Sequence, residues 1–109
     1  HCSRCRKASG SPFASSRLVR TEDFVVMEGE GSLKSFSHHG VHRVFCAHCG
    51  SPIISRRDAM PQGVRVRLGS LDSPLSRGPQ GHIYVASKAD WFEIHDSMPQ
   101  YPDDPPPSG

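Results

Sequence analysis

The stretch Val44-Phe45-Cys46-Ala47-His48-Cys49-Gly50-Ser51-Pro52 contains a CxxC turn, and Cys2-Ser3-Arg4-Cys5 contains a second one. A turn of this kind directs two sulfur atoms the same way, and two such turns can together surround a tetrahedral metal ion. Thiolates are soft ligands that favour zinc. The spacing therefore predicts Zn²⁺ as the cofactor, and spacing alone favours one ion held by Cys2, Cys5, Cys46 and Cys49.

Other uses of the cysteines fit this sequence less well. Disulfide frameworks are typical of short secreted chains that are dense in cysteine, whereas this chain has four cysteines in 109 residues and no apolar signal segment. A redox-active dithiol would need a βαβ pattern around its CxxC, and neither turn has one. We therefore expect a cytoplasmic protein whose cysteines bind metal and form no disulfides.

The composition excludes several classes of protein. A chain of 109 residues suffices for one domain, and a hydrophobic content of 35% with ten Gly and ten Pro indicates a small core. The free energy of binding a structural zinc ion is on the order of 10 kcal/mol and would then supply much of the stability of the folded domain. The net charge of +2 is too low to indicate a nucleic-acid partner. No apolar run approaches the roughly 18 residues of a membrane-spanning helix, so no membrane contact is expected.

Short segments rich in β-branched and aromatic residues, separated by turn residues, predict an all-β fold. The expected strands are residues 15–20, 24–27, 33–37, 42–45, 52–55, 64–68 and 82–86. Hairpin turns are expected at residues 28–31 and at residues 39 and 40. Short helical turns are expected at residues 3–9, ended by Gly10 and Pro12, and near residues 87–91.

Three blocks, residues 1–13, 44–52 and 82–101, resemble the signature blocks of the glutathione-dependent formaldehyde-activating enzyme family, which includes centromere protein V. They occur in the order and spacing of that family. The resemblance implies a zinc-binding domain over residues 1–101 with the fold of a small zinc-bound β-tent of stacked antiparallel, three-stranded sheets. Residues 102–109 are rich in proline and are expected to form a disordered tail.

The resemblance also implies how the cysteines are used. Cys46 and Cys49 match a structural CxxC, which in the family joins an N-terminal C-x-C. Cys2 and Cys5 match the last two cysteines of a catalytic C-x-C-x-x-C, whose first cysteine would stand immediately before His1. We therefore expect further strands upstream of His1. The resemblance favours two zinc sites, whereas the spacing alone favours one.

A zinc ion with three thiolate ligands keeps one position open for a substrate thiol. The resemblance accordingly implies a zinc-dependent carbon–sulfur lyase-type enzyme, similar to S-(hydroxymethyl)glutathione synthase, which condenses glutathione or a related thiol with formaldehyde. Cys2 and Cys5 are then its catalytic residues. Cations can bind the carboxylates of glutathione, and the nearest ones, which could equally be solvated charges, are Arg4, Arg6 and Lys7. The alternative is a non-catalytic zinc module whose β surface binds another protein.

The remaining histidines and aromatic residues are expected to be structural. Four histidines on predicted turns and hairpins are expected to be exposed polar residues, namely His38, His39, His42 and His48. His1 is expected to be a spacer beside Cys2 rather than a ligand. Trp91 and Phe92 are expected to pack in the core rather than to line a substrate site.

Overall fold

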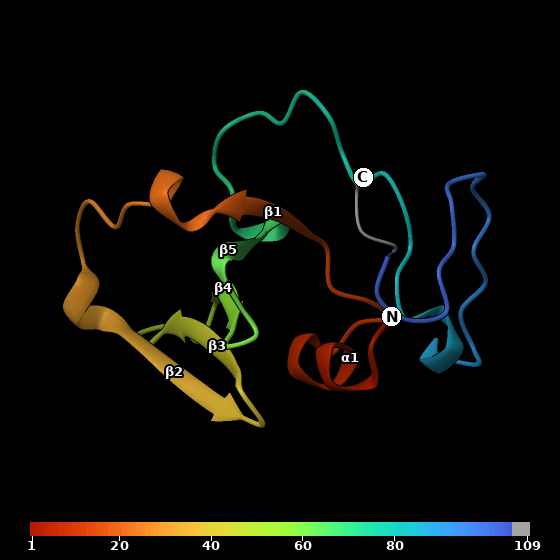
Figure 1. The fold of residues 1–109 in the computed structure, drawn as a ribbon, viewed down its shortest axis with the longest axis horizontal. Helices are drawn as coiled ribbons and strands as arrows, with labels where there is room; N and C mark the ends of the chain where they lie inside the picture. The colour runs from red at the N-terminus through yellow and green to blue at the C-terminus, as the bar shows by residue number, and fades with distance from the viewer. Residues whose placement is uncertain (106–109) are drawn as a thin grey trace. The chain divides into compact units, whose positions relative to one another are not determined.

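A computed structural model describes residues 1–105 and shows an all-β fold with one five-stranded sheet in the strand order β1-β5-β4-β3-β2 (Figure 1). The strands pair antiparallel and are β1 (Ser16–Arg20), β2 (Leu33–His38), β3 (Val41–Cys46), β4 (Pro52–Arg57) and β5 (Met60–Arg67). The predicted all-β class is confirmed. The stacked three-stranded sheets that the resemblance implied do not occur within the described residues.

The chain divides into two compact units. Unit 1 combines residues 1–14 with the chain from Leu75 onward, and unit 2 consists of residues 15–74. Unit 2 contains the whole sheet, whereas unit 1 contains the helix α1 (Ser3–Ser9) and irregular segments.

The hairpin between β2 and β3 has the predicted turn at His39 and Gly40. Both residues have positive φ, 49° and 75°, as a two-residue hairpin turn with the twist of the flanking strands requires. The amide of Asp58, in the next hairpin turn, donates to the carbonyl of Gly40 at 2.9 Å. Local sequence therefore fixes the register of this part of the sheet.

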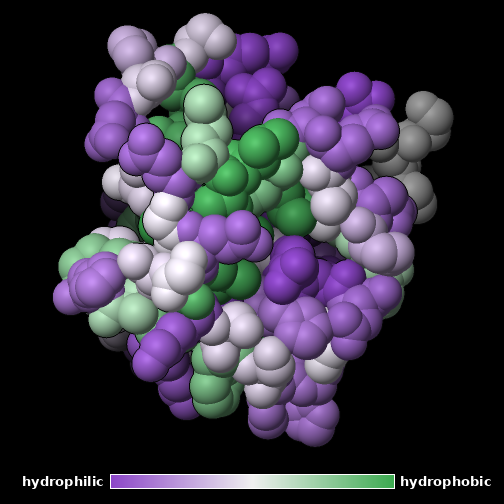
Figure 2. All heavy atoms as spheres, turned by 90° about the vertical axis from the view of Figure 1, so that its left-hand side faces the viewer, coloured by the Kyte–Doolittle hydropathy of each residue, from purple (hydrophilic) through white to green (hydrophobic). Residues whose placement is uncertain are grey.

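The core of unit 2 lies on one face of the three central strands. Val44, Ile54 and Val64 are buried, and Val44 is paired directly with Ile54 across β3 and β4. Further apolar side chains pack around them, namely Val19, Phe24, Leu33, Ile53 and Val66. The core is small, as the composition predicts, and apolar side chains also gather on the face drawn in Figure 2.

The predicted strand at residues 24–27 is wrong. Residues 21–23 form a 3₁₀ turn directly after β1, and the segment that follows pairs with no strand of the described sheet. Val25 and Met27 are 72% and 90% exposed, and only Phe24 of this segment packs against the core. Gly29, with a φ of 77°, leads into a 3₁₀ turn at residues 30–32 rather than into the predicted hairpin. A β-forming segment becomes a strand only where a partner strand meets it.

The predicted strand at residues 82–86 is also wrong. His82 forms a single bridge with Gln100, and Tyr84 has a φ of 56°, which interrupts the extended backbone. A 3₁₀ turn at residues 85–87 replaces the helical turn expected at 87–91. The backbone amides at 84–86 instead donate to carbonyls of the C-terminal segment at residues 101–103. Residues 106–109 of the predicted tail lie outside the described residues.

The helix α1 begins and ends as predicted. Cys2 is its N-terminal capping residue, and Gly10 ends it in the left-handed conformation with a φ of 65°. The amide of Gly10 donates to the carbonyl of Arg6 at 2.8 Å. Within the described residues, the helices are too short or too polar to cross a membrane.

Truncation of Ile54 should test the position of the core. We expect Ile54→Ala to lower the free energy of unfolding by about 2–5 kcal/mol, because it leaves a cavity between packed strands. The matched control is Val25→Ala, at an exposed position, which should change the stability by less than about 0.5 kcal/mol. Chemical denaturation measures both values, and equal losses for the two variants would contradict this description of the core.

Candidate zinc and thiol site

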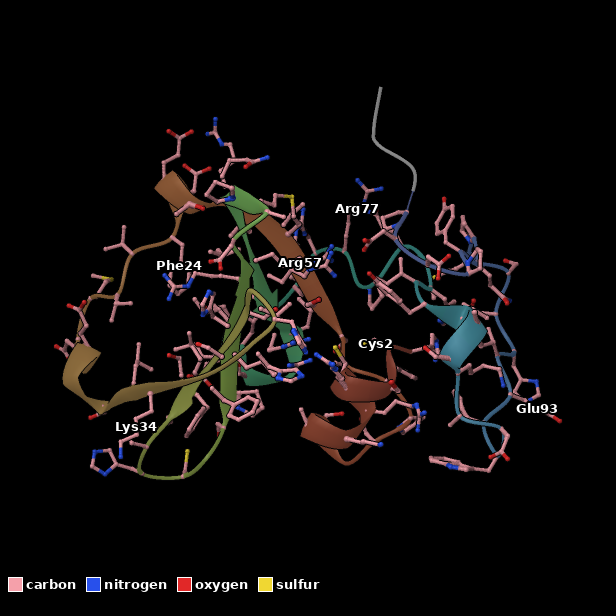
Figure 3. The ribbon with its side chains drawn as sticks, turned by 60° about the horizontal axis from the view of Figure 1, so that its bottom comes forward. Cys2, Phe24, Lys34, Arg57, Arg77 and Glu93 are labelled. Carbon is pink, nitrogen blue, oxygen red and sulfur yellow. The ribbon has the colours of Figure 1, made fainter. Side chains whose placement is uncertain are left out.

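Cys2 and Cys5 lie at the start of α1, in unit 1. Cys2 caps the helix (Figure 3) and Cys5 follows one turn later, so that both side chains lie on the same face of the helix. Both residues are half-buried, and neither forms a disulfide. The hydroxyl of Ser9 donates to the carbonyl of Cys5 at 2.8 Å and supports the last turn of this short helix. Both cysteines of this pair therefore belong to the first turn of one short helix.

The three cations predicted to bind glutathione differ in their surroundings. Arg6 is four residues after Cys2, on the same helix face, and is half-buried. Its Nε atom is buried and has no hydrogen-bond partner among the described residues. Arg4 and Lys7 are exposed. The structure therefore places only Arg6 with the cysteines as a partly enclosed cation.

Cys46 and Cys49 lie in unit 2, where β3 ends in a tight turn. The amide of Gly50 donates to the carbonyl of Cys46 at 2.7 Å, and the amide of Cys46 donates to the carbonyl of Ser51 at 2.9 Å. Gly50 has a φ of 77°, which a residue with a side chain adopts at a cost. These bonds close the CxxC turn that the sequence predicts.

The two sulfur atoms of this turn lie close to each other. The Sγ atom of Cys49 is 3.1 Å from the hydroxyl oxygen of Ser51. Hydrogen bonds from the side chain and backbone of Ser51, and from the Cys46 thiol, lower the pKa of Cys49. A turn that stabilises a thiolate beside a second sulfur suits a thiophilic metal ion.

The two cysteine pairs belong to different units, and each supplies two of the sulfur ligands that zinc prefers. Within residues 1–105, no three side chains of His, Cys, Asp or Glu form a group that could hold a metal ion. The chemistry of each pair fits zinc. Whether one ion or two are bound stays a prediction.

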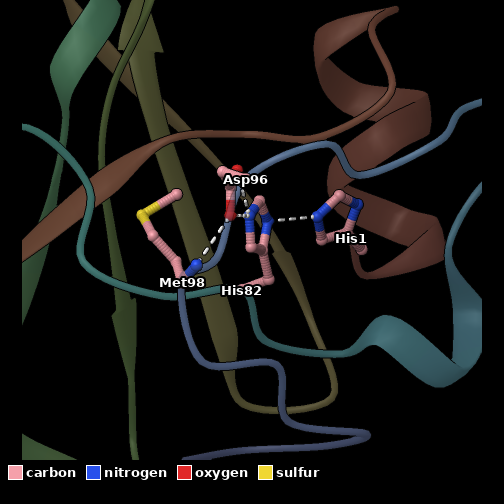
Figure 4. Close-up of polar contacts among 4 residues, drawn as sticks. All are labelled: His1, His82, Asp96 and Met98. Atoms are coloured by element: carbon pink, nitrogen blue, oxygen red, sulfur yellow. Dashed lines mark hydrogen bonds and ion pairs between the residues drawn. The ribbon is translucent and has the colours of Figure 1, made fainter.

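A polar cluster in unit 1 was not predicted from the sequence (Figure 4). His1 Nε2 lies 2.8 Å from His82 Nδ1, and His82 Nε2 lies 2.9 Å from an Asp96 carboxylate oxygen. Both histidines are buried. The rings of Phe13 and Phe92 lie 5.1 and 6.1 Å from that of His1. His1 is therefore a central residue of this unit rather than a simple spacer.

No local pattern could have revealed this cluster, because its members are far apart in the sequence. The only signal was that His1 and His82 each fall in one of the blocks that resemble the family. Phe92 packs against His1 as part of the cluster. Trp91 is 69% exposed, so its predicted place in the core is wrong.

The other histidines mostly follow the prediction. His38, His39 and His48 are exposed. His42 is half-buried, which corrects the expectation, because its ring bridges Ser37 on β2 and Asp58 in the turn between β4 and β5. Its Nδ1 atom is 2.7 Å from the Ser37 hydroxyl oxygen, and its Nε2 atom is 2.7 Å from a carboxylate oxygen of Asp58.

Comparison with known proteins identifies the family. The model of the glutathione-dependent formaldehyde-activating enzyme family matches residues 1–87. The chain belongs to this family. The resemblance of the three blocks is thereby confirmed, although the third block extends beyond the matched residues. Members of the family generally bind zinc, and this member has cysteines suited to it.

A solved structure shows the same fold. A Rhodobacter sphaeroides protein, determined as a structural-genomics target, is 23% identical and superposes with a TM-score of 0.58, covering 69% of this chain and 67% of its own. At this identity the likeness concerns the fold alone. No curated protein matches the chain significantly.

Removal of the metal should destabilise this family member. If the Cys46–Cys49 turn holds zinc, chelation should lower the melting temperature, because the free energy of metal binding is also free energy of folding. Cys46→Ser should lower it further than Ser35→Ala on an exposed part of β2. Differential scanning calorimetry with and without a chelator measures both effects, and a melting curve indifferent to metal removal would contradict the assignment.

Stability in acid should depend on Asp96. The hydrogen bond from His82 holds the pKa of this carboxyl below its ordinary value, and the amide of Met98 adds to the effect. In unfolded chains the pKa of Asp is about 3.9, so the ionised carboxylate contributes its full stabilisation at pH values above this. The contribution is lost as the pH falls through the pKa of Asp96 in the folded protein, which is lower.

We expect wild type to be more stable than Asp96→Ala at pH 6 and the difference to shrink progressively below pH 4. Urea denaturation across this range measures the difference. A gap that stays constant down to pH 2 would show that the ionised carboxylate has no part in it.

Proposed function

We propose that this family member is a zinc-dependent carbon–sulfur lyase-type enzyme that condenses glutathione, or a related small thiol, with formaldehyde. Membership of the family carries the proposal, because the matched residues include both CxxC turns. At the level of the family, the substrates are glutathione and formaldehyde. We also propose that residues 1–101 form its zinc-binding domain and that it works in the reducing cytoplasm, where thiols persist.

In this proposal, Cys2 and Cys5 hold the catalytic ion, and Cys46 and Cys49 hold a structural one. Zinc with an open coordination position would lower the pKa of a substrate thiol and favour its reactive thiolate form. The condensation needs no oxidant. The sulfur of glutathione forms a bond to the carbonyl carbon of formaldehyde, and the proton that the thiol loses ends on the carbonyl oxygen, which becomes a hydroxyl group.

Arg6 is the residue of this chain best placed to orient glutathione. A guanidinium binds a carboxylate through two parallel hydrogen bonds, and Arg6 is half-buried on the helix that begins at the two cysteines. A glutathione carboxylate bound by Arg6 would bring the thiol to the part of α1 that carries Cys2 and Cys5. Arg4 and Lys7, which are exposed, would contribute a weaker and more strongly screened attraction.

Steady-state kinetics should separate these roles. Cys5→Ala should abolish the protein-dependent formation of S-hydroxymethylglutathione while the fold is kept. Arg6→Ala should raise the KM for glutathione about tenfold with a smaller effect on kcat, because a charge-assisted hydrogen bond contributes about 1.5–3 kcal/mol. Lys7→Ala is the matched control on the same helix, and its KM should change less than threefold.

NMR of the hydroxymethyl product, corrected for the uncatalysed reaction, measures these rates. Equal rates for wild type and Cys5→Ala would overturn the proposed activity. If such a protein still bound zinc, the non-catalytic zinc module would be the better explanation.

A further inference from the structure

Asp96, His82 and His1 form a continuous chain of hydrogen bonds in unit 1 (Figure 4). The two carboxylate oxygens of Asp96 lie 3.1 and 2.9 Å from His82 Nε2. His82 Nδ1 lies 2.8 Å from His1 Nε2. The chain of hydrogen bonds therefore runs from Asp96, whose side chain is 42% exposed, to His1, which is 6% exposed.

The acid sets the order of the protons in this chain. An ionised carboxylate can only accept, so His82 carries its proton on Nε2 and, when neutral, accepts at Nδ1. His1 must then donate from Nε2, which leaves its Nδ1 as a bare lone pair. That Nδ1 atom is buried and has no hydrogen-bond partner among the described residues.

Residues 82–87 also hold the main chain of His1. Its backbone nitrogen donates to the carbonyl of Ile83 at 3.1 Å, and its carbonyl accepts from the hydroxyl of Ser87, also at 3.1 Å. The segment around residues 82–87 therefore fixes both the ring and the backbone of the residue that directly precedes Cys2. Since Cys2 caps α1, the same contacts fix where the helix begins.

We propose that His82 and Asp96 are positioning residues for the zinc-binding cysteines of α1. They hold His1 in one tautomer and one orientation, and thereby set the zinc affinity of Cys2 and Cys5 without ligating the metal. This inference rests on the proposed function, because it takes those cysteines as ligands. Groups hydrogen-bonded directly to a metal ligand typically change metal affinity 10- to 100-fold when they are removed. His82 and Asp96 act through His1, so their effect should be smaller, about threefold to tenfold.

The substitution Asp96→Asn tests the order of protons directly. The amide of Met98 donates to Oδ1 of Asp96 at 2.9 Å, so an asparagine would keep its oxygen there and turn its NH₂ group toward His82. His82 would then accept at Nε2 and donate from Nδ1. The order is reversed along the chain, and His1 is left with a buried N–H that has no acceptor, which is costly.

The matched control is Glu93→Gln. Glu93 lies in the same segment and pairs with His95 at 3.5 Å, but both side chains are 81% exposed and lie outside the chain of hydrogen bonds. Asp96→Glu keeps a carboxylate acceptor and is the rescue variant. Circular dichroism checks that each variant is folded.

Long-range ¹H–¹⁵N NMR of the zinc-loaded protein gives the first readout. We expect His1 to be protonated at Nε2 in wild type, Glu93→Gln and Asp96→Glu, and at Nδ1 in Asp96→Asn. A wild-type His1 that carries its proton on Nδ1 would overturn the inference. This result needs only the wild type, so the order of protons can be contradicted even if Asp96→Asn does not fold.

Competition with a chromophoric zinc chelator gives the second readout. The zinc bound by Cys2 and Cys5 is identified as the component lost in Cys5→Ala. Asp96→Asn should weaken this component about threefold to tenfold, less than the loss of a direct partner of a ligand. Glu93→Gln should leave it unchanged, and Asp96→Glu should restore most of it.

The experiment distinguishes a failure of the positioning role from a failure of the proposed zinc site. Unchanged affinity in a folded Asp96→Asn would overturn the positioning role and leave the proposed function intact. A Cys5→Ala variant that loses no zinc would overturn the proposed site and this inference with it.

Discussion

The buried hydrogen bond between His1 and His82 is the constraint on which unit 1 depends. Ala89 is the only buried hydrophobic residue of this unit among the described residues, so apolar burial contributes little to it. Two aromatic rings, Phe13 and Phe92, pack around the histidine pair instead. A polar interaction shielded in this way is strong, because the surrounding dielectric constant is low, and it is costly to break.

The sheet of unit 2 depends on a different interaction. The three buried hydrophobic residues of its core, Val44, Ile54 and Val64, lie on adjacent strands and hold β3, β4 and β5 together. The CxxC turn with Cys46 and Cys49 is a direct extension of β3, so this core also positions the turn. A small core and a turn suited to zinc complement each other, because bound zinc would add stability that apolar burial cannot supply.

The sequence was informative wherever structure is decided locally. The five observed strands, the helix α1 with its stop at Gly10, and the turn at His39 and Gly40 all follow from propensity and turn chemistry. Residues 24–27 and 82–86 have the same β-forming composition, but no strand meets the first, and the second is bent at Tyr84 and bonded to the C-terminal segment. The cysteines were evident from their spacing. The chain from His1 to Asp96 was not, because only the folded backbone brings these residues together.

The central claim is that Cys2 and Cys5 bind one zinc ion and that Cys46 and Cys49 bind another. X-ray absorption spectroscopy of the zinc-loaded protein, combined with metal analysis, tests this claim. We predict sulfur ligands at about 2.3 Å from zinc. Cys5→Ala and Cys46→Ser should each remove part of the metal and leave the rest bound to sulfur. Loss of all zinc from either variant would show one shared four-thiolate ion, and zinc without sulfur ligands in wild type would contradict the claim altogether.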